Sequence, residues 1–146
     1  MNIKRTIGAT LAGFVLLGGG RYLIHSVLLM GEYMKTPSLW RTQTAMLHHM
    51  WAIQLANFIF ALATVLIYNR GVESKPWLGQ GIRFGILLAL VTAVPQSLVE
   101  YFTYPVAHML AIHWIILEGA LAVLLGIVVA AICRPKAVVG FQPPTM

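Results

Sequence analysis

The chain has very few acidic and sulfhydryl groups. Its 146 residues include no aspartate, four glutamates and one cysteine, and only 10% of them are charged. A soluble protein averages about 25% charged residues. A domain this small could not bury a hydrophobic fraction of 59%, because its surface is large relative to its volume. These absences exclude an ordinary soluble domain and indicate a protein surrounded by lipid.

The single cysteine and the scattered basic residues exclude two further classes of site. With Cys133 alone, the chain can form neither an intramolecular disulfide nor a multi-cysteine zinc site. The net charge of +6 would suit nucleic acid if the basic residues shared one face, but they are spread over short segments between apolar runs. We therefore expect membrane lipids as partners, no nucleic acid, and Cys133 as an inert packing residue.

Four apolar runs are long enough, or nearly so, to cross a bilayer, which takes about 20 residues. No charge interrupts the chain between His49 and Arg70 or between Arg83 and Glu100. Backbone groups in hydrocarbon must bond within their own segment, so the runs are expected to be helices. The predicted fold is all-α: a polytopic membrane protein of one domain, 1–146, with four transmembrane helices at 7–30, 50–68, 82–101 and 111–133.

The basic residues predict how these helices are oriented. Cytoplasmic loops carry an excess of lysine and arginine, and seven basic residues fall on one side of the bilayer against Lys35 and Arg41 on the other. We therefore expect both termini, the loop 69–81 and the tail 135–146 to be cytoplasmic. The seven basic residues on the cytoplasmic side are Lys4, Arg5, Arg70, Lys75, Arg83, Arg134 and Lys136.

The first run also fits a cleaved signal peptide, but it continues past Gly20, so we expect it to be retained.

The chain consists of two similar halves. Residues 32–37 read Glu-Tyr-Met-Lys-Thr-Pro, residues 100–105 read Glu-Tyr-Phe-Thr-Tyr-Pro, and each motif follows a long apolar run. A histidine close before a tryptophan follows each motif, and each second run ends at an arginine. The pattern predicts an internal duplication of a helical hairpin, 7–70 and 81–134, about an axis along the membrane normal. Coincidence among similar apolar helices is the alternative.

One proline and a row of small residues predict a bend and a packing surface. Pro95 lies inside the third span, so we expect a kink there and a freed carbonyl near Gln96. Small residues recur on one face of the fourth span, which suits close packing against another helix. They are Gly119, Ala122, Gly126 and Ala130.

Polar side chains gather in the outer half of the predicted bundle. Arg21 lies well inside the first span, and an intramembrane arginine costs at least about 2.5–3.5 kcal/mol, so it usually has a partner. Glu118 lies at a similar depth in the fourth span and is the expected counter-ion of Arg21 or His25. The predicted cluster comprises Arg21, His25, Glu32, Gln54, Asn57, Gln96, Glu100 and Glu118. Three interpretations remain open: an ion pair that fixes helix register, a proton, ion or ligand site, and snorkelling of Arg21 to an interface.

Histidine and methionine concentrate on the same side of the bilayer. Both ligate copper, and two histidines can hold haem, so a copper or haem centre is an alternative function. No spacing is diagnostic, and no cofactor is predicted. The weak candidates for ligands are His25, His48, His49, His108, His113, Met46 and Met50.

No catalytic motif stands out. A serine, histidine and acid could be combined from Ser26 or Ser97, but no nucleophile elbow surrounds either serine. We therefore expect a protein that is not an enzyme. An intramembrane lipid-modifying enzyme remains an alternative, and it would need a wet cavity joining Glu118 or Glu100 to the bilayer.

Three strings connect the chain to a known group of proteins. They are His25-Ser-Val-Leu-Leu-Met-Gly-Glu32-Tyr33, Leu39-Trp40-Arg41 and Gly81-Ile-Arg-Phe-Gly85. Over most of its length the chain resembles small bacterial four-helix membrane proteins of unknown function. The resemblance implies a bacterial inner membrane and supplies no chemistry. We expect a small transporter-like protein or an accessory subunit and, because four short spans enclose little room, a homodimer or a larger complex.

Overall fold

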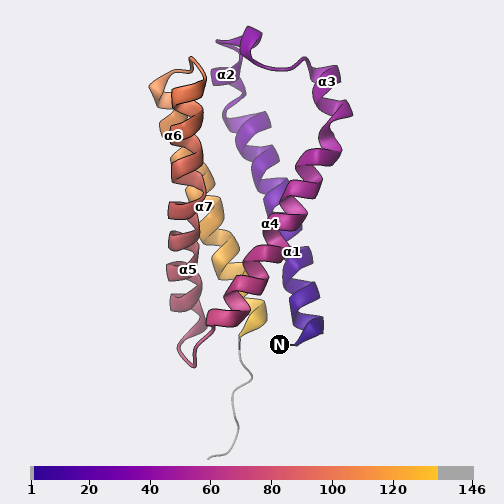
Figure 1. Ribbon diagram of the computed structural model, residues 1–146, viewed down its shortest axis with the longest axis vertical. Helices are drawn as coiled ribbons and strands as arrows, with labels where there is room; N and C mark the ends of the chain where they lie inside the picture. The colour runs from indigo at the N-terminus through magenta and orange to yellow at the C-terminus, as the bar shows by residue number, and fades with distance from the viewer. Residues whose placement is uncertain (1, 135–146) are drawn as a thin grey trace, which may run out of the picture.

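The computed structural model describes residues 2–134, which fold into helices and contain no strand. Four helical spans run along the molecule (Figure 1), and each is apolar and long enough to cross a membrane. The chain is therefore a multi-pass membrane protein with four spanning helices, which confirms the predicted fold class. The spans are α1 (Ile3–Tyr22) with η1 (Leu23–Leu28), α4 (Met50–Gly71), α5 (Trp77–Val91) with α6 (Ala93–Thr103), and α7 (His108–Cys133).

Three helices start three to five residues before the predicted apolar runs, whereas the second starts at the predicted Met50 and the first ends at Leu28, two residues before its predicted end. Backbone hydrogen bonding continues into the polar interface, whereas the apolar runs mark only the hydrocarbon. At the first helix start, for example, the Asn2 side chain accepts a hydrogen bond from the Lys4 amide over 3.1 Å, as an N-cap residue does. The predicted tail 135–146 lies outside the described residues.

The first two spans are joined by a longer connection at one end of the molecule. It contains α2 (Met30–Tyr33), the 3₁₀ turn η2 (Pro37–Leu39) and α3 (Gln43–His48). A short loop at the opposite end joins α4 to α5 (Figure 1).

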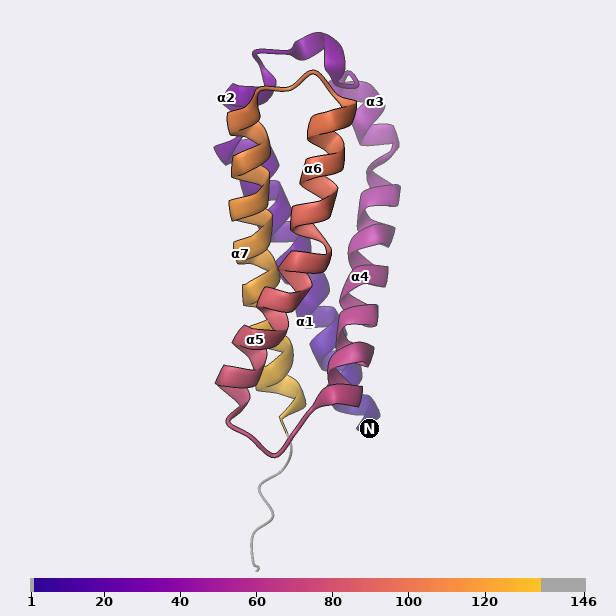
Figure 2. The same ribbon diagram turned by 60° about the vertical axis from the view of Figure 1, so that its left-hand side comes forward.

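The two central spans are α1 and α7. α1 packs on α4 and on α7, and α7 packs on both α5 and α6. In contrast, α4 makes no extended contact with the third span, and Figure 2 shows α1 between and behind α4 and α6. The third span is therefore separated from α4. These contacts do not test the predicted hairpin duplication, which stays a prediction.

A break divides the third span into α5 and α6. It falls at Thr92, whose φ of −121° and ψ of −71° are not helical, three residues before Pro95. The proline ring clashes with the carbonyl four residues earlier, and its nitrogen has no hydrogen to donate. The predicted kink is confirmed, but the carbonyl deprived of its partner belongs to Val91 and not to a residue near Gln96. The backbone amide of Gln96 donates a hydrogen bond of 3.1 Å to the Thr92 carbonyl.

Glycines bring α5 and α7 into backbone contact. A Cβ atom on Gly126 would lie 2.5 Å from the Gly81 carbonyl oxygen, and one on Gly85 would lie 2.5 Å from the Val123 Cα. Such distances leave room only for hydrogen, so the helices interlock at Gly81, Gly85 and Gly126. The predicted small-residue stripe on α7 is confirmed as a packing surface here. Cys133 is buried at the end of the same helix, as expected of a packing residue.

Candidate functional site

A change of helical pitch positions the first two site residues. α1 ends at Tyr22 and continues as a π-helix over Leu23–Leu28, closed by a 2.9 Å bond from the Leu29 amide to the Ile24 carbonyl. π-Turns add a residue per turn and are frequent at functional sites. Just before this segment α1 approaches α7 closely, because a Cβ atom on Gly20 would lie 2.5 Å from a methyl carbon of Leu121.

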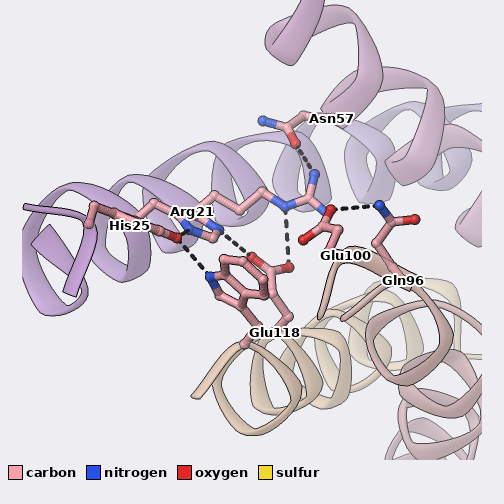
Figure 3. A network of polar contacts seen from close by, with 8 residues as sticks. Arg21, His25, Asn57, Gln96, Glu100 and Glu118 are labelled. Atoms are coloured by element: carbon pink, nitrogen blue, oxygen red, sulfur yellow. Dashed lines mark hydrogen bonds and ion pairs between the residues drawn. The ribbon is translucent and has the colours of Figure 1, made fainter. Parts of the chain in front are cut away.

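Arg21 and His25 converge on one carboxylate from α7 (Figure 3). Arg21 Nε lies 3.3 Å from Glu118 Oε2, and His25 Nε2 lies 3.0 Å from Glu118 Oε1. Arg21 Nη1 donates a second hydrogen bond, of 2.5 Å, to Asn57 Oδ1 on α4. Glu118 is thus the counter-ion of Arg21 and also a partner of His25, which confirms the predicted pairing. Three of the four spans are tied together at this point.

Two aromatic side chains extend the network towards the membrane surface. Tyr33 Oη lies 2.5 Å from His25 Nδ1 and accepts a 2.8 Å hydrogen bond from Trp114 Nε1. Tyr33 can therefore donate its hydroxyl hydrogen to His25, whose Nε2–H then donates to Glu118. Both nitrogens of the His25 ring therefore have a partner in the network.

Tyr33 should titrate at unusually high pH. Burial raises the pKa of Tyr33 to about 12, although the hydrogen bond from Trp114 opposes the shift. Because the folded state holds this proton more tightly than the unfolded state, whose tyrosine pKa is about 10, the free energy of unfolding should fall as pH rises from about 10 to 12. In an absorbance titration of the tyrosines, the Tyr33→Phe variant should show one fewer group ionising above pH 11 than the wild-type protein. An unchanged titration curve would contradict the buried hydroxyl.

A cleft of about 720 Å³ lies beside the network. It occupies the space where α4 and the third span separate, with α1 and α7 behind it. Arg21 and His25 of the first span, Glu118 of α7, and Gln96 and Glu100 of α6 all line it, and Figure 3 shows these side chains together. The amide Nε2 of Gln96 donates a 2.6 Å hydrogen bond to Glu100 Oε1. Both membrane-embedded carboxylates therefore border a single open space.

Two members of the predicted cluster lie apart from it. Glu32 pairs with Lys35 across 2.9 Å at the surface, and the hydrogen bond from Lys35 lowers the pKa of the Glu32 carboxyl. Gln54 is exposed on α4 and makes no side-chain hydrogen bond within residues 2–134. At 100° per residue, an unbroken α-helix would place Arg21, His25 and Glu32 on one face. The helix is not unbroken, so this prediction from the sequence is wrong. The π-helix and the break at Leu29 turn Glu32 away.

The candidate metal ligands do not gather. Across the described residues, no three His, Cys, Asp or Glu side chains form a group that could hold a metal ion. The stretch from Met46 to Met50 is broken at His49, whose φ is −101° and ψ is 7° and whose Nδ1 donates to the Ala45 carbonyl over 2.7 Å. Met46, His49 and Met50 therefore do not share one continuous helix. His48 and His108 are exposed, and His113 is half-buried.

Comparisons of the chain with protein-family models, with curated proteins and with solved structures gave no match.

Some site residues were not predicted from the sequence. Tyr33 and Trp114 carry the end of the network nearest the connection between the first two spans, and Phe60 lines the cleft. Tyr33 belongs to the repeated Glu-Tyr motif, which was the available signal. Its role depends on the π-helix, which has no sequence signature of its own. The central carbon of the Arg21 guanidinium lies 5.8 Å from the centre of the Phe60 ring. This contact joins two helices, and helical periodicity does not reveal it.

Proposed function

We propose that this chain is a non-enzymatic, transporter-like protein of the bacterial inner membrane, which holds a small ligand at its intramembrane polar cluster. The observation that carries the proposal is the cleft between α4 and the third span, with the Arg21–Glu118 pair on its wall. The resemblance to small bacterial four-helix membrane proteins supports the location. A homodimer, or membership of a larger complex, belongs to the same proposal.

The open space supports a ligand site over a purely structural ion pair. A pair that only fixes helix register is best sealed among other side chains, where nothing competes for it. Here the pair borders a cleft whose volume lies within the range of small-molecule sites, roughly 300–1,000 Å³. Its lining is mostly apolar, with a few convergent polar groups, which is the usual composition of such sites.

The proposed topology has both termini and the 69–81 loop in the cytoplasm, as the excess of basic residues there supports. Serines in the two opposite loops provide a matched test in a Cys133→Ala background, because Cys133 is the only cysteine. Ser38→Cys should react with a membrane-impermeant maleimide added to the outer face, and Ser74→Cys should react only after the membrane is opened. The reverse pattern would invert the topology.

The same reagent tests whether the cleft is a transport site. Ala56 lines the cleft on α4, whereas Leu55, its neighbour at the same depth, does not. A transporter exposes its site to each side in turn, so Ala56→Cys should react from outside in intact cells and from inside in inverted vesicles, and Leu55→Cys from neither. Reaction from the outside alone would indicate a fixed pocket. Protection from both sides would contradict the proposed function.

An intramembrane lipid-modifying enzyme is the second candidate, because it would need a cavity at Glu118 or Glu100. Glu100 and Glu118 both border the cleft, as do Ser97 and His25. No hydrogen bond joins Ser97 to His25 within residues 2–134, and both His25 nitrogens are engaged by Tyr33 and Glu118. The same engagement opposes His25 as a haem or copper ligand. An absorption spectrum with a haem band, or stoichiometric copper in the purified protein, would restore that alternative.

A further inference from the structure

One carboxyl group on the cleft has no basic partner. Arg21 and Glu118 form an ion pair there, and His25 also contacts Glu118. Glu100 is the second carboxyl group that lines the cleft. It has no ion-pair partner within the described chain, and its bond is to the neutral amide of Gln96. A carboxylate without a counter-ion is costly in a membrane, so a cationic group bound beside Glu100 would be stabilised.

Glu100 also lies where two hollows meet. Besides the large cleft, it lines an outer cavity of about 370 Å³ together with Trp40, Tyr104 and Trp114. Trp114 lines both spaces as well. A carboxylate among aromatic faces is the arrangement that binds an organic ammonium group, because ring faces attract cations. Arg41 lines the outer cavity too, but its side chain is exposed at the rim.

The rest of the cleft suits an apolar body. Its apolar lining includes Phe60 on α4, Val91 and Val99 on the third span, and Leu121 on α7. Because α4 and the third span do not pack along each other, an occupant can enter between them from the lipid. A bare metal ion would need several more oxygen ligands than Glu100 and Gln96 supply.

We infer that the cleft takes a lipophilic organic cation, an amine or quaternary ammonium with an apolar body, whose charged group pairs with Glu100. This inference rests on the proposed function and names the class of its ligand. The ammonium lies between Glu100 and Trp114. The apolar body fills the space between α4 and the third span. Arg21 stays paired with Glu118 and holds the cleft wall in place.

Two ions of the same shape and opposite charge test the assignment. Tetraphenylphosphonium and tetraphenylborate are offered separately to the full-length protein in phosphatidylcholine nanodiscs, and binding in excess of empty nanodiscs is measured by equilibrium dialysis. The cation should bind saturably and the anion should not. Glu100→Gln should weaken binding of the cation by at least about tenfold, because loss of one partner of a desolvated charge pair is costly.

Matched substitutions control for folding. Glu32→Gln and Glu73→Gln remove the two carboxylates that pair with lysines outside the spans, and each should leave binding within about twofold, since exposed pairs contribute little. Glu100→Asp keeps the charge and should retain most of the affinity. Equal binding in Glu100→Gln, or no saturable binding of the cation, overturns the inference. Preferential binding of the anion in an Arg21-dependent manner overturns the cation assignment but leaves the ligand site, whereas failure of the Ala56→Cys labelling removes the site itself.

Discussion

Replacing Glu118 with leucine is expected to lower the free energy of unfolding by about 3 kcal/mol, since removing one partner of a half-buried ion pair inside the membrane leaves the other charge uncompensated. Glu118 is the acceptor for both Arg21 and His25, so one substitution removes two contacts between the first and fourth spans. Thermal unfolding of the detergent-purified protein, followed by circular dichroism, measures the loss. Arg21→Leu should be similarly harmful, because it leaves the carboxylate without its guanidinium.

The double variant Arg21→Leu/Glu118→Leu separates an unpaired charge from lost packing. With both charges gone, the apolar pair should be more stable than either single variant, as is often found when buried ion pairs are replaced together. Glu73→Leu is the control, because Glu73 and Lys75 are both well exposed and such pairs contribute little. If Arg21→Leu alone left stability unchanged, the guanidinium would be snorkelling to an interface and the internal pair would be refuted.

Replacing Gly126 with alanine should destabilise the hairpin of the third and fourth spans by about 2–3 kcal/mol, the upper part of the range for overpacked cores. The new methyl group would lie 2.5 Å from the Gly81 carbonyl oxygen and 2.7 Å from the Gly85 nitrogen. Both atoms belong to the backbone, so relief requires the two helices to move apart. Gly126→Leu should prevent their association, and the loss of folded protein is measurable by size-exclusion chromatography.

Gly8 provides the matched control for this prediction. It lies in α1, and a Cβ atom there would meet nothing within 4 Å. Gly8→Ala should be neutral or stabilise the helix by up to about 1 kcal/mol, the difference in helix propensity between the two residues. If Gly126→Ala behaved in the same way as Gly8→Ala, the close contact between α5 and α7 would be wrong.

Much of the candidate site could be predicted because its chemistry is expensive in a membrane. A charge in hydrocarbon usually has a partner, and Arg21 and Glu118 are opposite charges at a similar depth of their spans, so depth indicated their pairing. The Glu32 prediction failed for a different reason. Its place on the Arg21 face depended on 100° per residue, whereas the π-helix at Leu23–Leu28 has a different pitch.

The partners of individual side chains could not be predicted in the same way. Gly126 lies in the predicted small-residue stripe, but Gly81 and Gly85 were noted only as part of a resemblance, and the contact joining them depends on how two helices cross. Likewise, Tyr33 lies in a repeated motif, yet its bonds to His25 and Trp114 depend on three separate segments meeting.

The sequence by itself determined that the chain crosses the membrane four times, and it predicted that a guanidinium inside the membrane would pair with a carboxylate. These properties follow from local composition, because lipid accepts only apolar helices and rejects unpaired charge. Only the tertiary structure decided that α4 stands apart from the third span and that Glu100 faces the resulting cleft. Packing in lipid lacks a hydrophobic force that pulls every helix together, so the hollow depends on which close contacts form, such as that between Gly85 and Gly126, and which do not.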